Sequence, residues 1–209
     1  DSIANDGNYT YVARVEDAAG NQGVESNEYQ ITLDTAAPSQ TVTITDIVDD
    51  EAPQTGSVAH GGSTNDKTPT LHGSLDAALG AGEEILIFRD GTQVGKATVA
   101  ADGVSWSFED NLTNDGNYSY TAQVVDKAGN TGTVSNQYDI ELDTKAPTQS
   151  VSIDQIIDDV DPTQGDIGDK GITNDTTPTL KGSLSQALGA GEYLAIYRNG
   201  SEIARLSEA

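Results

Sequence analysis

The stretch "NDGNYSYTAQVVDKAGN" at residues 114–130 decides the fold, because the chain contains it twice. Its near copy, "NDGNYTYVARVEDAAGN", occupies residues 5–21, a shift of 109 positions (114 − 5). The same shift aligns "TNDKTPTLHGSLDAALGAGE" (64–83) with "TNDTTPTLKGSLSQALGAGE" (173–192) without insertion or deletion. Solenoid repeats are about 20–50 residues long, whereas a unit near 100 residues has the size of an immunoglobulin-like sandwich. The sequence therefore predicts a series of whole domains.

The domain boundaries follow from a second repeated stretch, "ITLDTAAP" at 31–38 and "IELDTKAP" at 140–147. Each is an alternating strand that ends on an Asp and leads into Ala-Pro. We predict a complete domain at 39–147, the C-terminal part of a preceding domain at 1–38, and the N-terminal part of a following one at 148–209. On this interpretation the chain is an excerpt of a longer array.

Short alternating runs separated by Gly, Asp, Asn and Pro predict strands. The complete domain has seven such runs, at 41–48, 70–75, 84–91, 92–99, 104–110, 117–126 and 135–143. We expect Trp106 in the core. Tyr118 follows Asp115-Gly116 and occupies the place of a tyrosine corner, whose hydroxyl ties down the loop before it. The predicted fold is all-β: tandem immunoglobulin-like, seven-stranded antiparallel β-sandwiches in an elongated array.

Charge and composition exclude several classes of partner. The chain carries 34 acidic and 10 basic residues, a formal net charge of −24. Such a polyanion repels nucleic acid and anionic membranes and favours divalent cations as counter-ions. No run is apolar enough for a membrane span, so we expect no membrane insertion. The absence of Cys excludes disulfides and thiolate chemistry.

Three stretches carry a family resemblance: "LGAGEEILIFRDGTQVGKATV" (79–99), "DGNYSYTAQVVDKAGNTG" (115–132) and "LDTKAP" (142–147). They resemble the bacterial Ig-like tandem repeats of giant secreted adhesins, both biofilm-associated and RTX-type. The resemblance implies an extracellular, cell-surface stalk of many domains, with each domain contacting its neighbours in a monomeric rod. It also implies calcium at or near the domain junctions.

The acidic loops provide candidate ligands for that calcium. If 84–91, 117–126 and 135–143 are strands C, F and G, the loops 76–84 and 126–133 face the preceding domain. Asp34 then approaches Glu83 and Asp126 at the first junction, and Asp143 approaches Glu192 at the second. Asp17, the counterpart of Asp126, completes the set. Calcium takes 6–8 oxygens, including backbone carbonyls that Gly- and Asn-rich loops can present.

A second interpretation of these loops stays open. "DKAGN" is also a good turn sequence, in which Asp caps its own loop and Gly takes a positive φ. The acidic loop with Asp158, Asp159, Asp161, Asp166 and Asp169 is a weaker candidate, because only its first two Asp have acidic counterparts at 49–60. Neither interpretation distinguishes calcium from magnesium.

Nothing in the sequence indicates an enzyme. The counterparts of His60 and His72 are Asp169 and Lys181, so a catalytic or zinc role would be lost in the next copy. No nucleophile elbow or phosphate loop is present. We predict a structural stalk segment of an extracellular bacterial adhesin that supports surface attachment or biofilm formation, with the host or biofilm ligand bound elsewhere. The alternatives are a module that binds glycan or protein, and an accessory domain of a secreted enzyme.

Overall fold

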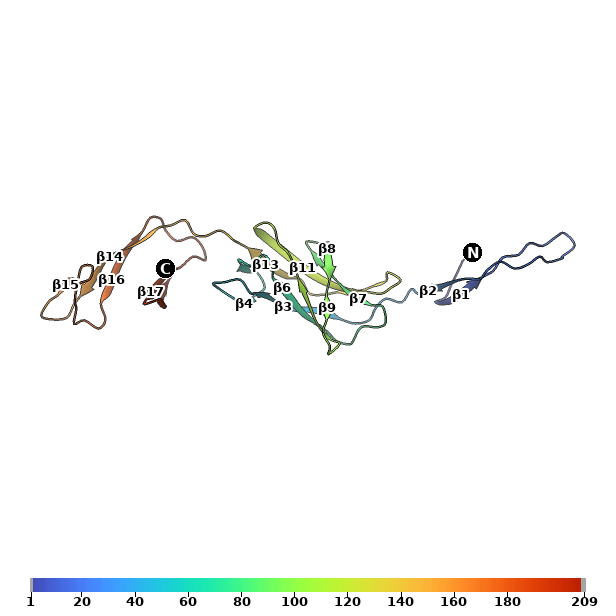
Figure 1. Cartoon of the computed structure of the whole chain (residues 1–209), viewed down its shortest axis with the longest axis horizontal. Helices are drawn as coiled ribbons and strands as arrows, with labels where there is room; N and C mark the ends of the chain where they lie inside the picture. Colours follow the sequence, from blue (N-terminus) through green and yellow to red (C-terminus); the bar gives the residue numbers. More distant parts are fainter. Residues whose placement is uncertain (1, 208–209) are drawn as a thin grey trace. The chain divides into compact units, whose positions relative to one another are not determined.

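The computed structural model describes residues 2–207 and shows an all-β protein (Figure 1). The chain divides into two compact units, Asp1–Thr144 and Lys145–Ala209. The division lies close to the boundary expected after residue 147, whereas the boundary expected after residue 38 falls inside the first unit. Within residues 2–207 there is no helix, and hence none that could span a membrane.

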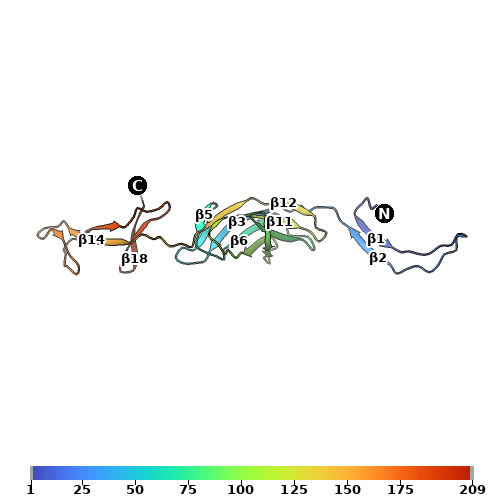
Figure 2. The same cartoon turned by 90° about the horizontal axis from the view of Figure 1, so that it is seen from above.

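The first unit contains a sandwich of two sheets between residues 42 and 142 (Figure 2). One sheet has the order β4-β3-β6-β10-β9, and all its strand pairs are antiparallel. Its strands are β3 (Val42–Asp49), β4 (Gly56–Val58), β6 (Thr70–Leu75), β9 (Thr98–Val99) and β10 (Ser105–Glu109).

The second sheet has the order β5-β13-β11-β7-β8, with β12 also paired to β11. Its strands are β5 (Gly62–Thr64), β7 (Glu84–Arg89), β8 (Thr92–Lys96), β11 (Gly116–Val125), β12 (Thr131–Val134) and β13 (Tyr138–Leu142). The strands taken as C, F and G, namely β7, β11 and β13, are neighbours in this order, as they are in immunoglobulin topology. The β5–β13 pair is parallel, and the other pairs are antiparallel.

The number of strands differs from the seven expected, because β3 to β13 make eleven. The expected strand 92–99 is split: β8 pairs with β7 in one sheet, and β9 pairs with β10 in the other. The chain therefore crosses between the sheets near Ala97, whose N–H donates to the Ile85 carbonyl at 2.9 Å. The expected loop between residues 49 and 69 contains β4 and β5, each of three residues. Runs this short carry too little alternation to be recognised.

The core lies between the two sheets and is formed by their inward-facing side chains. The β3–β6 pairing shifts register between Ile44 and Asp46, so that Ile47 turns inward and simple alternation along β3 is lost. The core residues are Val42, Ile44, Ile47, Val58, Leu71, Leu75, Ile85, Ile87, Trp106, Leu112, Tyr120, Ala122, Val124, Ile140 and Leu142. The prediction that Trp106 fills the core is confirmed, since it is 2% exposed.

Trp106 packs directly on the backbone of the neighbouring strand. Gly73 of β6 lies opposite Trp106 of β10 and opposite Ile44 of β3. A Cβ atom at Gly73 would lie 2.1 Å from Trp106 Cζ2 and 2.2 Å from the Thr43 carbonyl oxygen. Glycine is therefore required here because the indole ring occupies the space of a side chain.

The flanking segments repeat parts of this sandwich. In the first unit, β1 (Gly7–Tyr11) and β2 (Tyr29–Leu33) pair as β11 and β13 do. In the second unit, β14 (Val151–Asp158) pairs with β15 (Gly165–Asp166) and β16 (Thr179–Leu184), and β17 (Leu194–Arg198) pairs with β18 (Ser201–Leu206). The tyrosine corner is confirmed in both copies, because Tyr118 and Tyr9 donate to the carbonyls of Asn114 and Asn5.

Replacing Gly73 with Ala should destabilise the sandwich by about 1–3 kcal/mol, because the indole and β3 would have to move apart. Urea unfolding followed by fluorescence reports this directly, since Trp106 is the chain's one tryptophan. The control is His72→Ala on the exposed face of the same strand, for which we expect a much smaller loss. Equal losses in the two variants would contradict the packing role of Gly73.

Candidate functional site

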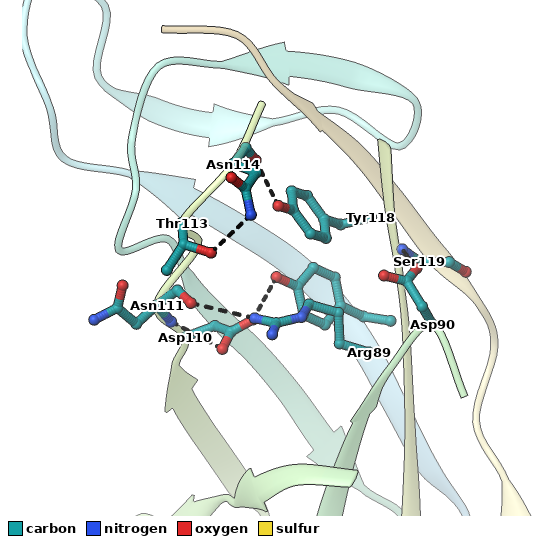
Figure 3. Close-up of polar contacts among 9 residues, drawn as sticks. Arg89, Asp90, Asp110, Asn111, Thr113, Asn114, Tyr118 and Ser119 are labelled. Atoms are coloured by element: carbon teal, nitrogen blue, oxygen red, sulfur yellow. Dashed lines mark hydrogen bonds and ion pairs between the residues drawn. The ribbon is translucent and has the colours of Figure 1, made fainter. Parts of the chain in front are cut away.

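A buried charged group links the two sheets of the sandwich (Figure 3). The carboxylate of Asp110, directly after β10, accepts hydrogen bonds from Arg89 Nη1 and from the Tyr120 hydroxyl, both at 2.7 Å. The Asn111 N–H donates to its other oxygen at 2.8 Å. The Arg89 guanidinium also lies over the Tyr118 ring, 5.5 Å from its centre.

These contacts satisfy both oxygens of the Asp110 carboxylate, whose side chain is 7% exposed. Burial, and then the hydrogen bond to Asp110, raise the pKa of Tyr120 well above its ordinary value. The hydroxyl therefore stays protonated and acts as a fixed donor. Because Asp110 follows one sheet and Arg89 and Tyr120 belong to the other, the group serves as a polar clamp between the sheets.

Sequence reasoning missed this clamp, although one signal was present. The turn Arg89-Asp90-Gly91 has the counterpart Arg198-Asn199-Gly200, so the arginine is retained where the acid beside it is not. Basic residues are few in this chain, and one kept in both copies at the same strand end indicates a buried partner. Asp110 is retained as well, since its counterpart is Asp1, but retention alone does not distinguish it among the many other acids.

Asp110→Ala should cost about 3–5 kcal/mol of folding stability, because it leaves a partly buried guanidinium and a buried hydroxyl without their acceptor. Chemical denaturation followed by Trp106 fluorescence measures the loss. The matched control is Asp102→Ala, which removes an exposed carboxylate that caps only its own turn through Ser105. The clamp would be refuted if the two variants unfolded at the same denaturant concentration.

The predicted calcium ligand Asp126 caps its own loop. Its Oδ1 accepts from the Asn130 N–H and its Oδ2 from Asn130 Nδ2, both at 2.8 Å. These bonds, led by that of the Asn130 amide, lower the pKa of the Asp126 carboxyl. Asp17 makes the same contacts with Asn21, and its pKa is lowered for the same reason.

The same Asn130 amide also contacts the preceding segment. Its Nδ2 donates to the backbone carbonyl of Asp34 at 3.0 Å. The structure thus brings Asp34 to the Asp126 loop, as expected, but through a carbonyl and an amide. The Asp34 carboxylate accepts instead from the N–H of Ala36 at 3.1 Å. Asn130 is the functional residue of this junction that sequence reasoning missed, and its place in the repeated "AGN" was the available signal.

Glu83 and Glu192 also have local roles. Glu83 Oε2 accepts from Gln40 Nε2 and from the Gly80 N–H, both at 2.6 Å. In the second unit, Glu192 Oε2 accepts from Gln149 Nε2 and the Gly189 N–H at the same distances. Each glutamate therefore closes its own glycine-rich turn and fixes the segment that leads into the first strand.

Asp143 lies at the end of β13, where its N–H donates to the Thr64 carbonyl at 2.9 Å. The next residue, Thr144, is fixed by Asp115, whose Oδ1 accepts from the Thr144 hydroxyl at 2.8 Å. Asp143 and Glu192 belong to different units. Their approach at a second junction stays a prediction.

A buried acidic network near Thr144 is the same in both copies. The Thr64 hydroxyl donates to Asp49 Oδ2 at 2.6 Å and accepts from the Asp66 N–H at 3.0 Å. Thr173 makes the equivalent bonds with Asp158 and Asp175, at 2.6 and 2.9 Å. A polar cavity of about 320 Å³ lies beside the first network, lined by Glu51, Asn65, Asp66, Lys67, Thr68 and Thr144. Backbone N–H groups and Thr hydroxyls satisfy these buried acids. The network therefore fixes the conformation of the loop between Asp49 and Asp66.

The residues present do not form a ready calcium cage. Within residues 2–207, no three His, Asp or Glu side chains lie close enough together to hold a metal ion. At the Asp34–Asn130 contact, two oxygens face one amide group, whereas calcium requires 6–8. The geometry therefore matches the interpretation of these acids as loop caps, and a calcium ion at the junction stays a prediction.

Comparison with known proteins agrees with the fold. Residues 41–144 match the family model of the bacterial Ig-like domain, a range that covers β3 to β13. Among solved structures, CopC from Methylosinus trichosporium OB3b is similar, with 16% sequence identity, over 49% of this chain and 93% of that one, and a TM-score of 0.31. A likeness this weak supports no inference about function. No curated protein matches. Residues 41–144 of this chain therefore form a bacterial Ig-like domain.

Proposed function

We propose that this chain is a non-enzymatic segment of an extracellular bacterial adhesin stalk, in which Ig-like domains follow one another head to tail. The observation that carries the proposal is the repeat of whole structural parts at one spacing. The hairpin β1–β2 repeats the pairing of β11 with β13, and the second unit repeats the β3–β6 pairing as β14–β16. The adhesin role itself rests on the resemblance of the repeated motifs.

The path of the chain through the complete domain supports a spacer. The domain begins at Val42, which lies opposite Leu75, at the pole where β7 begins and β11 ends. It finishes at Leu142, which lies opposite Gly116 at the start of β11. The ten residues of β11 separate these two poles by about 30 Å, at about 3.3 Å per residue. A chain that enters at one pole and leaves at the other adds length with every domain.

The polar chemistry of the domain is consistent with this role. Its buried acids are satisfied by fixed donors within the fold: Asp110 by Arg89 and Tyr120, and Asp49 by Thr64. Groups that are already saturated in this way hold loops and sheets in place and offer no reactive proton or nucleophile. The folding free energy of such an array is then approximately the sum of the stability of each domain and the contribution of each interface between neighbouring domains.

The decisive experiment is small-angle scattering on a series with one, two and three complete 109-residue repeats. We expect the maximum dimension to rise by a constant step of roughly 30–40 Å per repeat, the length of the domain's long strand plus its end loops. A maximum dimension that levels off as repeats are added would mean that the domains fold back on one another, and the spacer proposal would fail.

We also propose that calcium binds weakly at the junction. The net charge of −24 and the approach of Asp34 to the Asp126 loop support this proposal. Carboxylates that lie close together repel one another, and a divalent cation relieves this repulsion by neutralising them. Extracellular modules of this kind need only a Kd of about 10⁻⁴–10⁻³ M for calcium. The Asn130 contact in the described geometry shows that the junction also has a bond that needs no ion.

Calcium binding should appear as a rise in the unfolding temperature. At a calcium concentration ten times Kd, linkage gives about 1.4 kcal/mol of extra stability. Differential scanning calorimetry in millimolar calcium and in chelator measures it. Asp126→Asn should reduce the calcium-dependent rise. The control Asp90→Asn should keep it, because Asp90 follows β7 at the opposite pole, where β11 begins. A wild-type chain that unfolds at one temperature under both conditions would exclude a stabilising calcium.

A further inference from the structure

The segment that leads from β2 to β3, residues 34–41, is bound to the complete domain along its length. At its start, the Asp34 carbonyl accepts a hydrogen bond from Asn130 Nδ2 at 3.0 Å. Toward its end, Gln40 Nε2 donates to Glu83 Oε2 at 2.6 Å. These two hydrogen bonds fix the segment at the pole of the domain where β7 begins and β11 ends.

Two further contacts bind the rest of the segment. Pro38 is buried and packs on Gly132 of β12, where a Cβ atom would lie 3.0 Å from the Pro38 carbonyl oxygen. The Thr41 N–H donates to Asp76 Oδ1 at 2.8 Å, and the Thr41 carbonyl accepts from the Asp76 N–H at 3.2 Å. The segment is therefore part of the domain that follows it and is not a free linker.

The hairpin of β1 and β2 binds the same segment at the adjacent residue. Asp6, which directly precedes β1, accepts at Oδ1 from the Thr35 hydroxyl at 2.8 Å and from the Thr35 N–H at 3.1 Å. The Thr35 N–H and the Asp34 carbonyl belong to one planar peptide group. This peptide group is therefore bound on both sides, its N–H by Asp6 of the hairpin and its C=O by Asn130 of the complete domain.

The residues that bind this peptide group and the segment after it are identical in the two copies of the repeat. These pairs are Asp6 and Asp115, Asp34 and Asp143, Thr35 and Thr144, Pro38 and Pro147, Asn21 and Asn130, and Gly23 and Gly132. The first attachment also has the same geometry in its second copy, because the Thr144 N–H and hydroxyl donate to Asp115 Oδ1 at 3.2 and 2.8 Å. The contact of Gln40 recurs as well, since Gln149 donates to Glu192 at 2.6 Å.

We propose that the peptide group between Asp34 and Thr35 makes the domain junction a stiff joint that needs no metal ion, with Asp6 and Asn130 as its positioning residues. The inference rests on the head-to-tail order of domains proposed above, but not on calcium. Asp6 fixes the peptide group relative to the preceding hairpin, and Asn130 and the docked residues 36–41 fix it relative to the following domain. A change in the angle between the two domains must therefore break one of these hydrogen bonds.

Distances between spin labels across one junction test the proposal. The complete domain, residues 39–147, has a closed core of its own, so two copies joined head to tail contain one whole junction. Because the chain has no cysteine, His72→Cys in each copy places one label on the exposed side of β6 in each domain. Double electron–electron resonance in chelator should give a single narrow distribution, centred roughly 30–40 Å apart, which is one domain length.

The two copies provide matched controls for each other. Asn130→Ala in the second copy should widen the distribution at least about twofold, because the released segment gains conformational freedom. The same substitution in the first copy also removes the bond to Asp126 but faces no preceding domain, so it should leave the width unchanged. Asp115→Ala tests the other attachment in the reverse order: it should widen the distribution from the first copy, whose Thr144 lies at the junction, and not from the second.

The width and the mean of the distribution separate this proposal from the spacer role. A wild-type distribution that is broad in chelator and narrow only in calcium would overturn the ion-free joint while leaving the spacer role intact. Equal widths for Asn130→Ala in the first and the second copy would also overturn it. A mean distance much shorter than one domain length would show that the domains fold back on each other, which would refute the spacer role and the joint together.

Discussion

The structure depends on one constraint: two sheets must cover each other's apolar faces, and neither sheet comes from a continuous part of the chain. The first sheet joins β3 and β6 to β9 and β10, and the second joins β7 and β8 to β11 and β13. The opening and closing parts of each 109-residue repeat must therefore meet before either is covered. This explains why Val124 and Ile44 are buried while their counterparts Val15 and Ile153 are exposed.

The acidic residues help the two sheets to cover each other mainly by fixing the loops between their strands. Asp126, Asp17, Glu83 and Glu192 each accept hydrogen bonds from N–H groups within a few residues. A carboxylate that caps its own turn stabilises the conformation in which adjacent strands reach their partners. The loops thus hold their shape with the donors that the chain itself provides. A cation at the junction would therefore affect the orientation of neighbouring domains more than the fold of each domain.

Much of the fold could be predicted from the sequence, because alternation and the repeat are local and visible. The C, F and G strands, the buried Trp106 and the tyrosine corner of Tyr118 all follow from such patterns. The register shift between Ile44 and Asp46 could not, because a bulge changes which side chains face inward without changing composition. The crossing near Ala97 was missed for a similar reason, since one alternating run serves two sheets.

The candidate site was less predictable, because sequence patterns identify acids but not the donors that satisfy them. Asp34 and Asp126 were placed at one junction, but the group between them is the Asn130 amide, whose Nδ2 donates to both. An amide in this position satisfies a carboxylate and a carbonyl at once, the same two kinds of oxygen that calcium uses. Acid spacing alone therefore cannot separate an ion site from a hydrogen-bonded junction in a chain this acidic. What distinguishes the two kinds of junction is the orientation of the neighbouring Asn side chain. Its amide N–H group donates to the acids in a hydrogen-bonded junction, as Asn130 does here, whereas its oxygen would point inward in an ion site.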